Sequence, residues 1–272
     1  MEDTFGERMK NYEYVTRNYL TNRVPVIIRI DGKAFHNFTK GLDKPCDKVF
    51  LQAMAQTTKE LCEQIPRVII GYTQSDEISL VMMNTSNKNS DLWFSNNLSK
   101  VISVSASIAT LEFNKAFGNL AIQFDMDNGT MFDNPAKDSK YRSKIFTACF
   151  DSRAFNIPEE EIINYFIWRQ KDCQKNAVSS TARTMFSHSE LLNLNQQQQK
   201  DKMLNEKGFD FNNAFTQDFK TGCVFIKEKA ERVGYDNFGK KFVAMSNKWV
   251  KTNKIFEDEY EFFLKYIRMN RG

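Results

Sequence analysis

The chain has 272 residues, of which 41% are hydrophobic and 24 are phenylalanine, so it can bury a sizeable core and a disordered chain is excluded. Its 38 basic and 34 acidic residues leave a net charge of +4, which would suit a polyanionic partner without requiring one. No segment approaches the roughly 18 uninterrupted apolar residues of a membrane span, and the first residues lack the apolar core of a signal peptide, so we expect a soluble cytoplasmic protein without membrane contact.

Cysteine and histidine usage narrows the kinds of site that the chain can build. The five cysteines are widely spaced and form no CxxC motif, which is typical of reduced, mostly structural thiols. His36 and His188 are the only histidines, which argues against a histidine-rich zinc site. A catalytic metal would therefore depend on carboxylates, and carboxylates suit magnesium.

The first elements predicted along the chain are a strand, a helix and a hairpin. Residues 24–35 form a short β-branched run that ends at Asp31 and Gly32, which predicts a buried strand that stops at a turn. Asp47 can cap a helix, and apolar residues after it recur at helical spacing as far as Pro66. Together these signals predict a helix between the two strands. Two apolar runs follow, on either side of Ser75 and Asp76, and predict a β-hairpin.

A second helix and further strands complete the first half. Residues 91–117 have the length and apolar content of a long helix, and residues 120–132 predict another strand pair around Asn128–Gly129. The order strand, helix, strand, strand, helix, strand is the ferredoxin-like arrangement. We therefore predict an α+β fold with an antiparallel sheet and helices on one face. That plan is too common to indicate a function by itself.

The second half is predicted to be mostly helical. Residues 141–157 contain one more strand, and residues 158–173 form a helix with Pro158 in its first turn and Arg169 and Lys171 closing it. The four glutamines at 196–199 are expected in a solvated helix or loop. Residues 240–272 predict a strand plus a helix. We expect a catalytic domain at 1–140 and a C-terminal domain at 141–272.

The two acids Asp31 and Asp76 pose the main question of function. If their strands are neighbours, both carboxylates lie at the same end of one sheet. Unpaired carboxylates that close repel each other, by roughly 4 kcal/mol for unit charges about 4 Å apart at an effective dielectric of about 20, so the pair needs a cation. Two divalent ions bridged by aspartates are the apparatus of nucleotidyl transfer.

The neighbours of these acids have narrower roles. The Gly32 carbonyl could add an oxygen ligand, because no Cβ obstructs the approach. Adjacent residues of a strand face opposite ways, so Asp76 is favoured as the ligand and Glu77 has a supporting role. The alternative is an ordinary turn at Asp31–Gly32 and an ordinary hairpin tip at Asp76–Glu77.

Five sequence blocks resemble one family. They are "RIDGKAFHNFTKG", "KPCD", "YTQSDEISLV", "FDSRAF" and "WRQKDC". Together they are similar to the tRNA-His guanylyltransferases and their bacterial and archaeal relatives, the 3′-to-5′ RNA polymerases. The resemblance implies a ferredoxin-like polymerase palm that activates a tRNA 5′ end with ATP. The 3′-hydroxyl of an incoming nucleotide, typically GTP, then attacks the activated phosphate.

The resemblance also assigns residues to the site. It makes Asp31, Asp76 and Glu77 catalytic, and it implies two Mg²⁺ ions held by Asp31, Gly32 and Asp76. The nucleotide-binding residues that it implies are Arg29, Lys33, Ala34, Phe35, His36, Lys44, Asp47, Ser75 and Lys100. A solvated surface charge stays the alternative for the lysines, and a turn serine stays the alternative for Ser75.

One departure from the family concerns the RNA. Eukaryotic members carry His-Ile-Asn-Asn after the "WRQ" helix, whereas this chain reads Gln174-Lys175-Asn176-Ala177. The following "TMFSHSELL" resembles the bacterial Thg-like branch, which repairs truncated tRNA 5′ ends by templated addition. Asn176 remains a candidate RNA contact, and His188 is expected to be structural. The family further implies a homotetramer.

Two other functions remain open. A palm-type nucleotide cyclase also places acids on a hairpin, although its Gly-Gly-Asp/Glu-Glu-Phe signature is absent. The other alternative is a non-catalytic RNA-binding module with a decayed site, although every proposed metal ligand is present. No P-loop, GxGxxG or HExxH motif appears, so nothing supports a Walker-type NTPase, a dinucleotide enzyme or a zinc protease.

Overall fold

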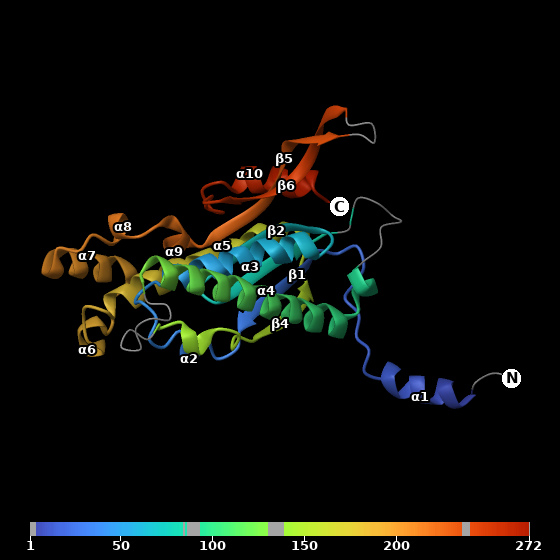
Figure 1. Ribbon diagram of the computed structural model, residues 1–272, viewed down its shortest axis with the longest axis horizontal. Coiled ribbons are helices and arrows are strands. Elements are labelled where there is room, and N and C mark those ends of the chain that lie inside the picture. Colours follow the sequence, from blue (N-terminus) through green and yellow to red (C-terminus); the bar gives the residue numbers. More distant parts are fainter. Residues whose placement is uncertain (1–3, 84, 86–92, 130–138, 236–239, 272) are drawn as a thin grey trace.

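A six-stranded antiparallel sheet organises the chain (Figure 1). The computed structural model describes residues 4–83, 85, 93–129, 139–235 and 240–271. The strands are β1 Val26–Gly32, β2 Val68–Gln74, β3 Glu77–Met82, β4 Phe150–Asn156, β5 Cys223–Tyr235 and β6 Lys241–Thr252. The helices of the first half are α1 Thr4–Tyr14, α2 Phe35–Phe38, α3 Lys48–Gln64 and α4 Leu98–Asp127. Those of the second half are α5 Ile162–Ala182, α6 His188–Leu191, α7 Gln196–Lys207, α8 Phe211–Ala214, α9 Gln217–Thr221 and α10 Tyr260–Met269.

The central four strands have the predicted ferredoxin-like order. The sheet runs β4-β1-β3-β2-β5-β6, and α3 and α4 connect β1 to β2 and β3 to β4. β2 and β3 are buried along their whole length, because helices cover both faces. The α+β prediction is confirmed.

Alternate residues of the strands pack into two separate hydrophobic cores, one on each face of the sheet. Ile28 and Ile30 of β1 pack with α3 and α4, whereas Ile27 packs on the other face with Phe166 of α5 and Phe263 of α10. The prediction of helices on one face therefore holds for α3 and α4 only. α5 and α10 cover the second face.

The strand pair predicted at 120–132 is wrong over the residues that the structure describes. α4 continues to Asp127, and Asn128 ends it as the C-cap; residues 130–132 lie outside the described residues. Phe113, Phe117 and Ala121 are buried at four-residue spacing, which extends one apolar stripe past the predicted helix end. The strand that completes the ferredoxin-like order is β4, which the sequence also predicted.

The C-terminal half combines helices with a long hairpin. α5 runs on to Ala182, so Arg169 and Lys171 lie within the helix and the prediction that they close it is wrong. The glutamines at 196–199 begin α7, and the predicted terminal strand and helix are β6 and α10. β5 and β6 extend as a hairpin beyond the rest of the sheet (Figure 1).

The sheet takes strands from both sides of residue 140. β4, β5 and β6 follow it and pair with β1 and β2, which precede it. A division into a catalytic and a C-terminal unit stays a prediction. All five cysteines are free. None of the helices in the described ranges has the length and hydropathy needed to cross a membrane.

Candidate active site

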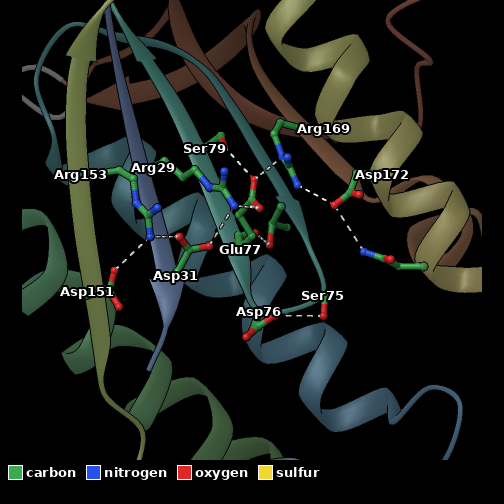
Figure 2. Close-up of polar contacts among 12 residues, drawn as sticks. Arg29, Asp31, Ser75, Asp76, Glu77, Ser79, Asp151, Arg153, Arg169 and Asp172 are labelled. Carbon is green, nitrogen blue, oxygen red and sulfur yellow. Dashed lines mark hydrogen bonds and ion pairs between the residues drawn. The ribbon is translucent and has the colours of Figure 1, made fainter. Parts of the chain in front are cut away.

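Asp31 and Asp76 lie at the same end of the sheet, as predicted (Figure 2). Asp31 lies opposite Glu77 of β3 and Asp151 of β4 in the strand register. The backbone N–H of Gly32 donates to the carbonyl oxygen of Asp76 at 3.0 Å, which ties the end of β1 to the β2–β3 turn. Figure 2 shows the carboxyl groups of Asp31 and Asp76 at the same end of these strands.

Asp76 lies in a turn in which Ser75 has a strained backbone conformation, and no basic side chain among the described residues pairs with the Asp76 carboxylate. Ser75 has a φ of 49°, in the left-handed region, and its hydroxyl donates to Asp76 Oδ1 at 3.1 Å. Asp76 forms no ion pair with any residue that the structure describes. Burial raises the pKa of Asp76, and the charge of Asp31 raises it further. This carboxylate would therefore gain from a cation.

Glu77 is held by two arginines. Its side chain is buried, and its Oε2 pairs with Arg29 Nη2 at 2.7 Å while its Oε1 pairs with Arg169 Nε at 2.8 Å. Burial still leaves the pKa of Glu77 above its ordinary value, although Arg169 and Arg29 act to lower it. The carboxylate is thus engaged inside the protein, which is consistent with the supporting role predicted for it.

Alternating charges extend from this pair across the site (Figure 2). On the β4 side, Arg153 Nη2 lies 2.6 Å from Asp31 Oδ2 and 3.5 Å from Asp151 Oδ1. On the α5 side, Arg169 Nη2 pairs with Asp172 Oδ2 at 2.7 Å. Asn176 donates to the same Asp172 oxygen at 3.4 Å, so it lies at the end of this series of contacts.

Arg153 and Arg169 were not predicted as site residues. Both lie inside blocks that resemble the family, "FDSRAF" and "WRQKDC". Their position in these blocks was the sequence signal that could have identified them as site residues. The β4 register places Arg153 directly opposite Arg29. Arg169 reaches Glu77 because α5 crosses the face of the sheet on which Glu77 points.

A cavity lies beside the hairpin tip. Its volume is about 220 Å³, and its lining includes the predicted residues Lys44, Asp47, Ser75 and Asn176. Those residues come from three segments: the loop before α3, the β2–β3 turn and α5. The structure therefore brings two candidate phosphate-binding groups, Lys44 and Ser75, to one cavity.

The other predicted nucleotide-binding residues are more dispersed. Lys33 and Ala34 are exposed on the turn after β1, and His36 is exposed in α2. Arg29 is neutralised by Glu77 and Asp31. Phe35 is buried in an aromatic cluster with Phe38, Phe50, Phe113 and Phe150. Only its backbone is thus available to a nucleotide.

Lys100 lies apart from these residues. It is in the first turn of α4, on the face of the sheet opposite to Arg29, and its Nζ lies 5.8 Å from the ring centre of Phe94. The structure does not join it to the charges around Asp31. Its predicted nucleotide contact stays a prediction.

Gly32 has a packing role that the sequence analysis missed. A Cβ at this position would run into the ring of Phe35. We expect Gly32→Ala to lower the free energy of unfolding by about 1–3 kcal/mol, the usual cost of overpacking a core. Urea unfolding measures it; an unchanged midpoint would show that Phe35 moves aside freely.

The donors at this edge fit a magnesium ion. Two carboxylates, Asp31 and Asp76, and the Gly32 carbonyl provide hard oxygen ligands, and Mg²⁺ is commonly bound by one or two carboxylates plus substrate phosphates. Among the described residues no group of three or more His, Cys, Asp or Glu could hold a metal. The remaining ligands would have to come from substrate and water. Because Arg153 now pairs with Asp31, a metal would compete with this arginine for the carboxylate.

Comparison with known proteins shows the family to which the chain belongs. The family model for tRNAHis guanylyltransferase matches residues 6–158. The chain is similar to the structure of a bacterial tRNA(His) guanylyltransferase (Thg1)-like protein in complex with ATP, with 34% identity, a TM-score of 0.75, and coverage of 97% of this chain and 99% of that one. It is also similar to the bacterial structure in complex with GTP, with 33% identity, a TM-score of 0.73 and the same coverage.

Curated relatives include eukaryotic enzymes. The tRNA(His) guanylyltransferase of Schizosaccharomyces pombe is 28% identical over 257 residues, which cover 90% of this chain and 88% of that protein. The tRNA(His) guanylyltransferase 1 of Arabidopsis thaliana is 27% identical over 260 residues, 88% of this chain, and the alignment spans only 42% of the Arabidopsis protein.

Proposed function

Because the chain belongs to the tRNAHis guanylyltransferase family, a family of nucleotidyltransferases, we propose that it adds nucleotides to tRNA 5′ ends in the 3′-to-5′ direction. The observation that carries the proposal is that Asp31 and Asp76 lie at the same end of the sheet, where a cavity beside the hairpin tip is lined by Lys44 and Ser75. ATP would activate the 5′ phosphate, and GTP or another nucleotide would supply the attacking 3′-hydroxyl.

The residues of the site would divide the work as follows. Asp31, Asp76 and the Gly32 carbonyl would hold two Mg²⁺ ions. When bound, such ions supply Lewis-acid stabilisation of the charge on the transferring phosphate. Lys44 and the Ser75 hydroxyl would bind phosphate oxygens, because phosphoryl transfer depends mainly on positioning and charge neutralisation. Arg29 and Arg169 would keep Glu77 ionised and fixed in place behind the ligands.

The substrates are proposed from the relatives and from the helix α5. Similar bacterial structures are complexes with ATP or GTP, which supports nucleotide binding by this chain; we place it in the cavity because Lys44 and Ser75 line it. The exposed Asn176 is proposed to contact RNA, with templated repair of shortened tRNAs as the reaction. A homotetramer, a cytoplasmic location and RNA contacts by residues 141–272 belong to the same proposal.

Lys44 gives a first prediction. If its ammonium group binds the triphosphate, Lys44→Ala should raise the KM for ATP by roughly 10-fold or more, since a charged hydrogen bond contributes about 1.5–3 kcal/mol. The affinity for tRNA should stay unchanged. Steady-state activation kinetics and fluorescence anisotropy with labelled tRNA measure the two quantities. Equal losses in both would show that Lys44 has no specific role towards the nucleotide.

One assay separates the candidate functions. The protein is incubated with magnesium, ATP, labelled GTP and a tRNA that lacks its first nucleotide. A 3′-to-5′ transferase lengthens the RNA and incorporates label. A cyclase forms cyclic product without RNA, and a binding module does neither; both outcomes would reject the proposal.

A further inference from the structure

The loop that carries Lys44 is held from outside the cavity. Residues 43–47 line the cavity, and Asp47 ends the loop as the N-cap of α3. Lys140 and Tyr141, which precede β4, contact two residues of this loop, Asp43 and Asp47. None of these contacts was anticipated from the sequence.

The carboxylate of Asp47 is fully occupied by these contacts. Its Oδ1 accepts from the backbone N–H of Phe50 at 3.1 Å, in the usual manner of a helix cap. Its Oδ2 accepts from the Tyr141 hydroxyl at 3.0 Å and from the Asp43 N–H at 3.3 Å, and lies 3.0 Å from Lys140 Nζ. The Tyr141 hydroxyl also lies 3.3 Å from Oδ1, so both oxygens are engaged and the roughly four acceptor positions of a carboxylate are taken. The side chain is only 2% exposed.

Lys140 and Tyr141 are themselves fixed in place. Lys140 Nζ also pairs with Asp43 Oδ2 at 2.5 Å, and its acidic partners raise the pKa of Lys140 despite the opposing effect of burial. Tyr141 is 1% exposed, and its ring packs edge-on against Phe117 and Phe124. Burial raises the pKa of Tyr141 to about 12, so its hydroxyl stays protonated and can donate.

We propose that Asp47, Lys140 and Tyr141 form a clamp that fixes loop 43–47 and so positions Lys44 towards the nucleotide. The resemblance assigned Asp47 to nucleotide binding. The geometry makes it a positioning residue, which acts through Lys44 and does not touch the ligand. The inference rests on the proposed function, since it concerns the same nucleotide cavity.

Tyr141→Phe tests the clamp, because it removes one hydroxyl and keeps the ring in its aromatic neighbourhood. We expect the KM for ATP in 5′ activation to rise about fivefold, the factor that one net hydrogen bond corresponds to. The kcat and the Kd for tRNA should not change. In a Lys44→Ala background, Tyr141→Phe should have no further effect on KM, because contacts that act through one residue are not additive.

Tyr266→Phe is the matched control. Tyr266 is also buried, and its hydroxyl accepts from the backbone N–H of Lys227 and donates to the carbonyl oxygen of Ile69, but it does not line the cavity. Tyr266→Phe should lower the free energy of unfolding about as much as Tyr141→Phe does, without changing the KM for ATP. An unchanged KM in Tyr141→Phe, or equal effects in the presence and absence of Lys44, would overturn the clamp.

Hydrogen exchange provides a readout that needs no turnover. In Tyr141→Phe the amides of residues 43, 44, 46 and 47 should exchange several-fold faster, while those of Tyr266→Phe keep the wild-type rate there. Unchanged exchange would overturn the inference even if the protein transfers nucleotides. Wild-type protein that never lengthens RNA, with the exchange difference present, would reject the proposed function and leave the clamp as an element of the loop's structure.

Discussion

We expect Asp76→Ala to abolish nucleotide transfer, with a loss on the order of 10³-fold or more, without destabilising the protein. The loss follows because the substitution removes a proposed ligand of ions that contribute several kcal/mol to charge stabilisation. Stability is maintained because Asp76 has no ion pair among the described residues and lies near another carboxylate. Transfer is measured with a shortened tRNA, and folding is measured by urea unfolding.

The pH dependence of stability provides the control for this substitution. The folded-state pKa of Asp76 is raised, so the folded protein binds the proton more tightly than the unfolded chain does. Wild-type stability relative to Asp76→Ala should therefore fall as the pH rises from the unfolded pKa through the raised folded pKa. Full transfer activity in folded Asp76→Ala would falsify the site.

Arg169→Ala should have the largest effect on stability. Removing one partner of a buried pair leaves a buried charge without its counterion, which typically costs about 3–5 kcal/mol. Glu77 would keep Arg29, so we expect a value near the lower end, about 3 kcal/mol. The raised pKa of Glu77 shows that its burial already outweighs two arginines, and losing one should raise this pKa further.

Lys171→Ala is the control on the same helix. Lys171 pairs with Glu257 at 2.8 Å, but both side chains are more than half exposed. An exposed pair of this kind contributes less than about 1 kcal/mol. Urea unfolding of the two variants compares a buried with an exposed ion pair two residues apart. Similar midpoints would mean that Arg169 contributes nothing through Glu77.

Features of the fold and the site could be predicted from the sequence where a short local pattern and the tertiary structure favour the same conformation. Asp47 caps α3 because its carboxylate satisfies the N–H of Phe50, and such a cap can be recognised from a short stretch. The placement of Asp31 and Asp76 at the same end of the sheet could be predicted for a similar reason. Each acid stands where an apolar strand stops, and the ferredoxin-like order makes those strands neighbours.

The errors arose where a local signal competed with a longer pattern. Asn128–Gly129 is a typical hairpin turn, yet the buried spacing of Phe113, Phe117 and Ala121 extends α4 and makes Asn128 its C-cap. Arg169 suits the end of a helix because of the helix dipole. It is instead buried within α5, because Glu77 lies opposite on the sheet.

Contacts between distant segments could not be read from the sequence. Lys140 and Tyr141 stand about 95 residues beyond the loop that they hold, and no local pattern links them to Asp47. Arg153 finds Asp31 only through the register of β4 on β1. In both cases the acid, Asp47 or Asp31, was predicted as a site residue. Its partner could be identified only from the fold.

Sequencing of RNA 5′ ends tests the central claim most directly. A pool of intact and shortened tRNAs is incubated with magnesium, ATP and all four nucleoside triphosphates, and with wild-type protein or Asp76→Ala. We expect shortened tRNAs to regain their missing first nucleotides, matched to the opposite strand of the acceptor stem, with wild-type protein only. Unchanged 5′ ends with wild-type protein, or equal extension by the variant, would contradict a transferase whose chemistry depends on these two acids.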